Sequence, residues 1–356
     1  MRNIILVTLI SIVLLVSCAP APTAAPAPAT SAPATAAQAK TALVVPLGWL
    51  LNDEFTPLVA AQKQGFFSAG GLDVTLISGG GSTGFDPIKA INGMDPKIIF
   101  GVPADMSAVI NAHAQGLDVV AIAAFTPIAP AAFFALTANG NHAKSPCDFK
   151  GKVVAMQADS LWIPEVLGQQ CPASQGGPLK SGVDFTVIPA GFTPDCLFSK
   201  QCDFYSGWVT NQAYAFEQKG LVEGKDYEYF MYSDFMPIYY GDVVVTTSQN
   251  IKNHPDRVKA FVQAVANGLK YVYENPANGI QIADTIEGVD PLHAAWRIPA
   301  QNKITMTDDT KAHGFGWIDI DKVQQEIQFL YDNKQITKMF DAHEIVDMSF
   351  YSEINK

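Results

Sequence analysis

Aromatic side chains stand directly after several expected strands, where an open α/β fold presents residues to a ligand. An indole or phenol ring in that position can stack on a flat ring, although packing between lobes explains any single aromatic equally well. Aromatic residues from both halves of the chain together favour a planar heteroaromatic solute. The four residues are Trp49, Trp162, Trp208 and Tyr239.

Polar groups near these aromatics can hydrogen-bond the carbonyl and hydroxyl oxygens of such a solute. Asn52 follows Trp49, and the glycine triplet 79–81 would bring backbone N–H groups to the edge of the site. Asp105 and Asp159 each begin an expected helix, so capping is the alternative role for both. The predicted ligand-binding set is Trp49, Asn52, Phe55, Gly80, Ser82, Asp105, Phe125, Asp159, Trp162, Tyr205, Trp208 and Tyr239. We predict no catalytic residue, no cofactor and no metal site.

The charge of the chain argues against anionic partners. Its formal net charge is -11, with 34 acidic against 23 basic residues, which disfavours nucleic acid and anionic lipid as partners. The arginines are Arg2, Arg257 and Arg297, and bidentate arginine forks are the usual clamp for phosphate or sulfonate. The sequence contains no GxGxxG, Walker loop, HExxH or GxSxG motif, and its histidines are scattered. We therefore expect a neutral ligand and no enzymatic activity.

The first residues are expected to be an export signal rather than part of the fold. Arg2 precedes an apolar run over 4–16 that is too short to span a bilayer and ends at Cys18. This segment resembles the lipobox of bacterial lipoproteins, with an ordinary secretory signal as the alternative. The resemblance implies that 1–17 is removed and Cys18 is acylated. Residues 18–40, rich in Ala, Pro and Thr, then form a tether at the extracytoplasmic face of the cell membrane.

Four further cysteines indicate two disulfides in an exported protein. Three connectivities are possible for Cys147, Cys171, Cys196 and Cys202. We favour Cys196–Cys202, which closes a tight loop, and Cys147–Cys171, which would tie the start of a βα unit to the end of its helix. A metal site is the rival interpretation, but the sequence has no CxxC motif.

Short β-branched runs alternate with helical stretches from residue 42 onward, which predicts an α/β fold with mostly parallel sheets. Strands are expected over 42–47, 72–77, 98–102, 119–125, 133–136, 153–157, 185–189 and 243–247. Helices are expected over 55–69, 85–92, 104–115, 161–170, 211–219, 256–274 and 323–333. We interpret 41–131 with 237–356 as one lobe and 132–236 as a second, joined by two crossovers. The ligand would then lie in the cleft between the lobes.

Several segments resemble the bacterial solute-binding proteins related to the yeast thiamine-pyrimidine synthase. They are PLVAAQKQGFF at 57–67, GLDV at 71–74, GLDVVAIA at 116–123, KGKVVA at 150–155 and NHPDRVKAF at 253–261. The resemblance covers the chain from about residue 42 to its end. It implies a type-II periplasmic-binding-protein fold and partnership with an ABC permease and its ATPase. We expect the protein to be a monomer.

Members of that family bind different solutes, so the side chains that line the cleft determine which solute is bound. Riboflavin suits neutral donors and stacking aromatics, and the chain looks similar to the riboflavin-binding, RibY-type lipoproteins of the family. A thiamine pyrimidine precursor is the alternative, supported weakly by Glu165. Pyrimidine-binding members carry Asp immediately before the tryptophan, however, where this chain has Gly48. Taurine, other sulfonates and nitrate rank lower without an arginine clamp. A synthase-like enzyme is the alternative of a different class.

Overall fold

The computed structural model describes residues 39–80, 85–158 and 160–351. Residues from Ala39 onward form one compact unit. The predicted signal peptide, Cys18 and the tether as far as 38 lie outside the described residues. Within the described part, no helix combines the length and the hydropathy that crossing a membrane requires.

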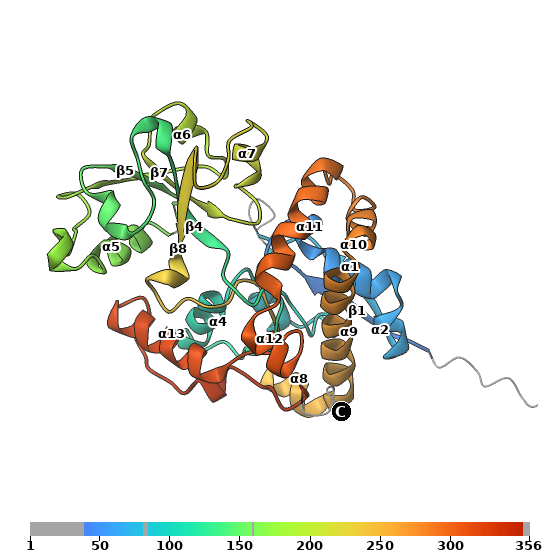
Figure 1. Ribbon diagram of the computed structural model, residues 1–356. Helices are drawn as coiled ribbons and strands as arrows, with labels where there is room; N and C mark the ends of the chain where they lie inside the picture. Colours follow the sequence, from blue (N-terminus) through green and yellow to red (C-terminus); the bar gives the residue numbers. More distant parts are fainter. Residues whose placement is uncertain (1–38, 81–84, 159, 352–356) are drawn as a thin grey trace, which may run out of the picture. The chain divides into compact units, whose positions relative to one another are not determined.

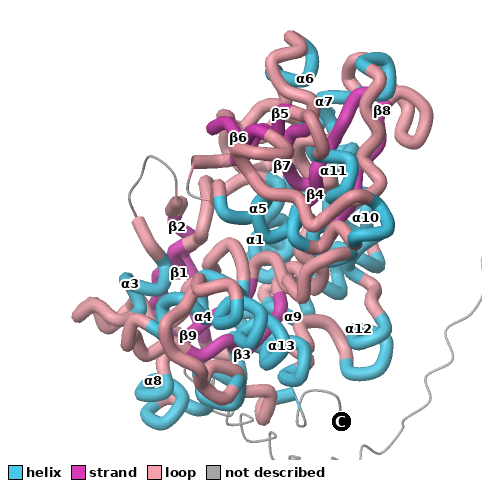
Figure 2. Tube along the Cα trace, turned by 90° about the vertical axis from the view of Figure 1, so that its left-hand side faces the viewer, coloured by secondary structure: helices cyan, strands magenta, loops and turns pink. Residues whose placement is uncertain are grey.

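Two groups of strands lie apart from each other in both views (Figures 1 and 2). We call the parts of the molecule that contain them the first and the second lobe. The first lobe contains β1 (Thr41–Pro46), β2 (Leu72–Ile77), β3 (Val120–Ala124) and β9 (Val243–Thr246). The second contains β4 (Ala131–Leu136), β5 (Val153–Met156), β6 (Thr186–Pro189), β7 (Phe204–Trp208) and β8 (Tyr227–Met231).

In the first lobe, β1 pairs with β2 in parallel and β3 pairs with β9 antiparallel. The expected strand over 98–102 is wrong as a strand, because only single bridges form there. Val102 pairs with Leu47 beyond β1, and Gly101 pairs with Val245 of β9, so this short segment joins the two pairs of strands. Pro96 and Pro103 bracket the segment, and proline cannot donate to a sheet ladder.

The second lobe holds one five-stranded sheet in the order β6-β5-β7-β4-β8. β5 is parallel to β6 and β7, whereas β4 is antiparallel to β7 and β8. The expectation of mostly parallel sheets is therefore only partly correct. β4 follows one crossover and β9 follows the other, and each runs antiparallel to a strand next to it in its own sheet.

Helices cover the sheets of both lobes (Figure 1). The first lobe has α1 (Thr56–Lys63), α2 (Phe66–Ala69), α3 (Pro87–Ile91), α4 (Met106–Ala114), α8 (Ser248–Asn253), α9 (Pro255–Glu274), α10 (Pro276–Ala283), α11 (Pro291–Thr305), α12 (Asp308–His313) and α13 (Ile320–Asp332). The second has α5 (Trp162–Gln169), α6 (Asp195–Phe198) and α7 (Tyr214–Glu217). The expected helix over 55–69 is divided, because Gly65 adopts a left-handed φ of 76° between α1 and α2.

The two crossovers between the lobes are hydrogen-bonded to each other. The N–H of Ala129 donates to the carbonyl of Tyr239 at 2.8 Å, and the N–H of Gly241 donates to the carbonyl of Thr126 at 3.0 Å. The N–H of Thr126 in turn donates to the carbonyl of Asp242 at 2.9 Å. Any movement of one lobe against the other therefore has to act on this pair of segments.

Both favoured disulfides are confirmed. Cys147 bonds to Cys171 and Cys196 bonds to Cys202. The first bond ties the segment before β5 to the end of α5, and the second closes the loop between α6 and β7. Both lie in the second lobe, so they constrain the unfolded chain of that lobe alone.

Candidate functional site

Trp49 lies just after β1, at the carboxyl end of the strand, as the sequence predicts. Its indole is half-buried and meets the ring of Phe192 from the second lobe edge-on, with centroids 5.0 Å apart and planes at 61°. Phe192 follows β6, also at the carboxyl end of its strand, and its side chain is 60% exposed. The two lobes therefore bring aromatic rings together at their strand ends. Sequence reasoning missed Phe192, which stands in a polar turn.

Glycines let the backbone pack closely under Trp49. A Cβ on Gly80 would overlap the carbonyl of Gly48 and would lie 3.2 Å from Cε3 of Trp49. Gly80 also has a φ of 63°, which favours glycine. The N–H of Gly79 donates to Trp49 and that of Gly80 donates to Phe85. The expectation that both bring bare N–H groups to a ligand is therefore wrong, and Gly80 instead makes room for the indole.

Three predicted ligand residues are core residues. Phe55 and Phe125 are buried and stack on each other with centroids 6.0 Å apart. Tyr205 is also fully buried, burial raises the pKa of its hydroxyl, and the hydroxyl donates to the carbonyl of Gly191 at 3.1 Å. Their rings pack in the core, so the predicted contact of these three residues with a ligand is wrong.

The predicted polar residues have structural partners. The side chain of Asn52 accepts the N–H of Glu54 at 2.9 Å and caps the short helix η1 (Asp53–Phe55). Asp105 caps α4 by accepting the N–H of Ala108 at 2.7 Å. A carboxylate oxygen of Glu165 accepts the N–H of Ser181 at 2.6 Å. Ser82 and Asp159 lie outside the described residues, and their predicted role stays a prediction.

The remaining aromatic candidates occupy different places around the lobes. Trp162 begins α5 and packs against the cores of both lobes. Trp208 ends β7, and its backbone N–H donates to Oε1 of Gln212 at 2.7 Å. Tyr239 lies in the second crossover, where its hydroxyl donates to Oε1 of Gln325 on α13 at 2.9 Å. Trp49, Trp162 and Trp208 are each half-buried and remain candidates for ligand contact.

A second contact between the lobes joins α7 to α11, a helix that sequence reasoning missed. The ring of Tyr214 lies 5.0 Å from that of His293 and 5.3 Å from that of Trp296. Nδ1 of His293 is 2.6 Å from a carboxylate oxygen of Asp53, which begins η1 just beyond Trp49. The same segment of the first lobe therefore supports both contacts with the second lobe.

Behind this contact lies a group of ionisable side chains, which we call the Arg297 cluster: the buried Asp53, Glu54, Asp242 and Arg297, and the half-buried His293. Nη2 of Arg297 is 3.4 Å from Glu54 and Nη1 is 3.8 Å from Asp53. Arg297 is 1% exposed, and among the described residues its guanidinium nitrogens have no hydrogen-bond partner. Asp242 accepts the hydroxyl of Thr126 at 2.9 Å, so the cluster reaches the crossovers.

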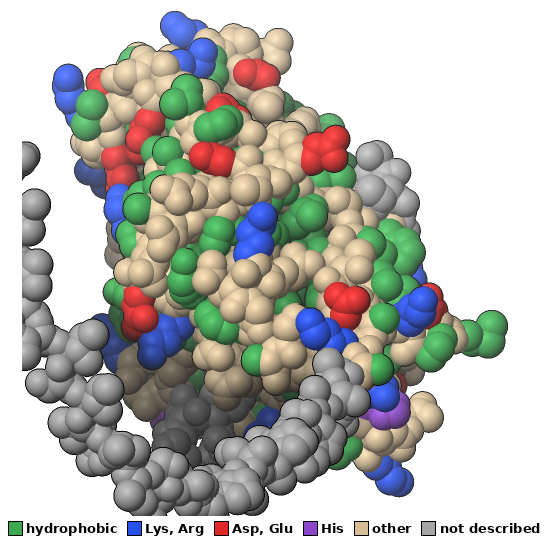
Figure 3. Space-filling model, turned by 90° about the vertical axis from the view of Figure 1, so that its right-hand side faces the viewer, with side chains coloured by type: hydrophobic (Ala, Val, Ile, Leu, Met, Phe, Trp, Pro, Cys, Tyr) green, Lys and Arg blue, Asp and Glu red, His purple; other side chains and the backbone are tan. Residues whose placement is uncertain are grey.

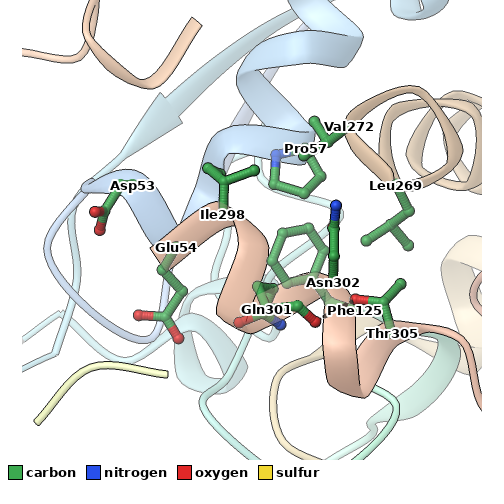
Figure 4. A pocket seen from close by; sticks show the side chains of 10 residues that line it. All are labelled: Asp53, Glu54, Pro57, Phe125, Leu269, Val272, Ile298, Gln301, Asn302 and Thr305. Carbon is green, nitrogen blue, oxygen red and sulfur yellow. Dashed lines mark hydrogen bonds between the residues drawn. The ribbon is translucent and has the colours of Figure 1, made fainter. Parts of the chain in front are cut away.

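Next to the cluster is a small cavity of about 10 Å³, close to the space that one water molecule needs. Figure 4 shows Asp53 and Glu54 at one end of it and the apolar side chains of Pro57, Leu269 and Val272 at the other. Burial raises the pKa of Asp242 well above its usual range, and the neighbouring Glu54 adds to this while Arg297 opposes it. The cavity is too small for an organic solute.

Another buried carboxyl group, Glu326 on α13, lies beside the crossovers. Its Oε1 accepts the hydroxyl of Ser107 at 2.6 Å, and its Oε2 has no hydrogen-bond partner among the described residues. The pKa of Glu326 is raised to about 8, mainly by burial and also by the nearby Asp105, while hydrogen bonds from the Ser107 hydroxyl and the backbone of Tyr239 oppose the rise. The folded protein therefore keeps a proton at Glu326 over a pH range in which the unfolded chain has lost it.

We expect the Glu326→Gln variant to gain stability relative to the wild type as the pH rises from 5 to 8.5. A raised carboxyl pKa makes the free energy of unfolding fall between the unfolded value and about 8, and glutamine cannot titrate. The relative gain is on the order of 1–4 kcal/mol, since each pKa unit corresponds to about 1.4 kcal/mol. Urea unfolding at both pH values measures it, with the exposed Glu287→Gln as control. Equal shifts in both variants would contradict the buried origin of the effect.

Metal ions and nucleic acids each require a particular grouping of side chains. The described part contains no group of three or more His, Cys, Asp or Glu side chains arranged to hold a metal ion. On the face in Figure 3, basic side chains are interspersed with acidic ones rather than gathered in a patch. The four cysteines there are disulfide-bonded.

The NMT1/THI5 like family model matches residues 52–279, well over half of the chain. No curated protein matches the sequence. A putative sulfonate ABC transporter protein, the periplasmic sulfonate-binding protein SsuA from Methylobacillus flagellatus KT, superposes with a TM-score of 0.62 at 15% identity, covering 89% of this chain and 94% of that one. The periplasmic aliphatic sulphonate binding protein SsuA from Escherichia coli gives 0.60 at 14%, covering 86% and 92%.

The same fold also occurs in an enzyme. The desulfurization enzyme DSZB superposes with a TM-score of 0.58 at 13% identity, covering 89% of this chain and 99% of that one. Identities this low carry the fold but not the ligand. From its family match and its structural neighbours, the chain belongs to the NMT1/THI5-like family and has the periplasmic-binding-protein fold.

Proposed function

We propose that this protein is the solute-binding lipoprotein of an ABC importer, anchored through Cys18 outside the cytoplasm, and that its solute is riboflavin. The observation that carries the proposal is the meeting of Trp49 and Phe192 at the strand ends of two lobes. Rings that both lobes supply can enclose a flat solute when the lobes close. The closed form then delivers riboflavin to a membrane permease powered by an ATPase.

The arginines support a neutral solute. Arg297 is buried against Asp53 and Glu54, so its charge is already compensated. Arg257 lies in the first turn of α9. Ala260 lies one helical turn after Arg257 in α9, and a Cβ added to Gly70 would lie 2.9 Å from its Cβ. Gly70 lies just before β2, so this end of α9 lies near the amino ends of the strands. Neither arginine is thus placed to clamp an anion beside Trp49.

A sulfonate is the second candidate, because two structures with the same fold are named as sulfonate-binding proteins. A site for sulfonate without arginine would have to rely on lysine, hydroxyl or backbone donors. The N–H groups of Gly79 and Gly80 already donate to backbone carbonyls. These two N–H groups of the described residues are thus already used, and riboflavin is the better match.

A thiamine pyrimidine precursor is less well supported than riboflavin. Pyrimidine-binding proteins that this chain resembles carry Asp where it has Gly48. A Cβ on Gly48 would lie 2.7 Å from the backbone nitrogen of Ala104 and 3.0 Å from the carbonyl oxygen of Val102. The backbone around Gly48 would have to move before any carboxylate could stand there, so the pyrimidine contact has no equivalent.

An enzyme of this fold is the alternative from a different class, since DSZB shares the fold. The four cysteines of the described part are held in disulfides, so they provide no thiol nucleophile. His293 faces Asp53 and the ring of Tyr214 rather than a serine or cysteine. These environments favour binding over catalysis.

Titration of riboflavin into the full chain, purified in a mild detergent, tests the proposal. Stacking on an indole should quench flavin fluorescence saturably at micromolar riboflavin or below. Taurine, an alkanesulfonate and an aminopyrimidine should leave the melting temperature unchanged, whereas riboflavin should raise it. Stabilisation by a sulfonate together with no quenching of riboflavin would reject riboflavin in favour of the second candidate.

A further inference from the structure

Phe192 is a large apolar side chain that the fold leaves mostly exposed. It stands in the turn between β6 and α6, and 60% of its side chain is accessible. Its ring contacts the indole of Trp49, which belongs to the other lobe. Because its ring meets that of Trp49 instead of packing into the core of its own lobe, Phe192 is placed to take part in the site.

The backbone of this turn is held from two sides. The hydroxyl of Tyr205 donates to the carbonyl of Gly191 at 3.1 Å, and Nε2 of Gln212 donates to the carbonyl of Phe192 at 3.2 Å. Oε1 of the same glutamine accepts the N–H of Trp208 at 2.7 Å. Gln212 therefore fastens the turn after β6 to the end of β7, using both ends of its amide.

The close approach of Gln212 to β7 depends on a glycine. A Cβ on Gly207 would lie 2.9 Å from Cβ of Gln212 and 3.0 Å from the ring of Tyr205. Gln212 thus packs directly against the backbone of Gly207, and its side-chain amide reaches the turn that carries Phe192. Two residues later, the ring of Tyr214 contacts His293 and Trp296 of the first lobe. The segment from Gly207 to Tyr214 therefore holds the turn that carries Phe192 and also supplies a ring contact with the first lobe.

We propose that Phe192 is the second-lobe contact of the solute and that Gln212 is the residue that positions it. This inference rests on the proposed function and names the chemistry of the same site. Centroids 5.0 Å apart leave no room for a ring between Trp49 and Phe192 as they stand. A flat aromatic solute enters when the lobes move apart. It then stacks on one of the two rings and contacts the edge or the face of the other. An aliphatic anion gains nothing from this pair.

Contact and positioning can be separated by mutation. Phe192→Leu keeps an apolar side chain and the backbone carbonyl that Gln212 binds, but it removes the ring. Gln212→Glu keeps an acceptor for the N–H of Trp208 and loses the Nε2 donor to the turn. Phe192→Tyr retains the ring and is the conservative variant. Val183→Ala, at a 74% exposed apolar residue of the same lobe, is the matched control.

The experiment measures the Kd of riboflavin by fluorescence quenching for the full-length wild type and each variant. We expect Kd to rise roughly five- to tenfold in Phe192→Leu, to rise about threefold or more in Gln212→Glu, and to stay near the wild-type value in Phe192→Tyr and Val183→Ala. The double variant Phe192→Leu with Gln212→Glu should bind no more weakly than Phe192→Leu alone. The melting temperature of each variant checks that the fold is intact.

The outcomes separate this inference from the proposed function. If the wild type bound riboflavin and Phe192→Leu bound it with equal affinity, the role of Phe192 would be overturned. Riboflavin would remain the proposed solute. Additive losses in the double variant would overturn the positioning role of Gln212, because a residue that acts through Phe192 adds nothing once the ring is gone. A wild-type protein that responds to a sulfonate and to no flat aromatic solute would overturn both proposals.

Discussion

Replacing Arg297 by alanine is expected to lower the free energy of unfolding by about 3–5 kcal/mol, which is the usual cost of removing one partner from a buried ion pair. Arg297 is 1% exposed and lies within 4 Å of two carboxylates, with Nη2 3.4 Å from Glu54 and Nη1 3.8 Å from Asp53. Without the guanidinium, these carboxylates and Asp242 remain buried together. Urea unfolding of both proteins at pH 7 measures the loss.

The loss should grow with pH. The pKa of Asp242 is already raised by burial and by Glu54, and Arg297 opposes that rise. The variant therefore raises this pKa further, so its folded state keeps a proton that the unfolded chain gives up above about pH 4. Its free energy of unfolding then falls more steeply than that of the wild type as the pH increases. Unfolding measured at pH 5 and at pH 8 shows the difference.

Two comparisons identify the cause of the loss. Arg257→Ala removes an arginine from the first turn of α9, outside the Arg297 cluster, and should change stability by about 0.5 kcal/mol at most. Adding Glu54→Gln to Arg297→Ala should restore part of the loss, because it removes one of the uncompensated charges. A loss that is the same at both pH values and is not restored in the double variant would mean that Arg297 acts by packing alone.

The regular elements of the fold were largely predictable. β1 and β2 are short apolar runs that end at turn residues, and the structure places them within a residue of their expected bounds. The expected 256–274 helix is α9, Pro255–Glu274, because its apolar positions recur at helical spacing between two prolines. In these segments local pattern and tertiary packing agree, so the sequence alone was sufficient.

The elements that join the lobes were not predictable in the same way. α11 contains Pro299, and the residues that it turns inward include Arg297 and His293, so an apolar pattern does not mark it. The expected helix over 211–219 is only the short α7, and residues 209–213 before it form turns instead. A hydrogen bond or ion pair between distant segments leaves no periodic signal.

The surroundings of Trp49 could be predicted only in part. Trp49 was found because it follows a strand, which is also why Phe55 and Phe125 were assigned to the ligand. Whether a strand-end aromatic turns toward the core or away from it depends on packing, and these two stack on each other in the core. Phe192 stands in the sequence AGFTP, which signals only a turn, and its nearness to Trp49 arises from the packing of two lobes.

We expect Trp49→Ala to weaken riboflavin binding by about 2–3 kcal/mol, or roughly 30- to 150-fold in Kd, as is typical of a buried aromatic at the centre of a binding site. The indole lies against the bare backbone of Gly80, where a Cβ would be 3.2 Å from Cε3. A ring supported in this way is already ordered before the solute arrives, so little conformational entropy is lost on binding. Flavin fluorescence titrations of the full chain measure the effect.

Matched variants decide whether the ring itself is responsible. Trp49→Phe keeps an aromatic face and should lose less affinity than Trp49→Ala, while Trp317→Phe should bind like the wild type. Trp317 stacks on His313 near the end of the chain and contacts Tyr351 rather than the second lobe. Trp208→Ala tests the end of β7 independently. If Trp49→Ala and Trp208→Ala both bound riboflavin with unchanged affinity, the solute would bind elsewhere. A flat solute enclosed at these strand ends would lose affinity when either indole is removed.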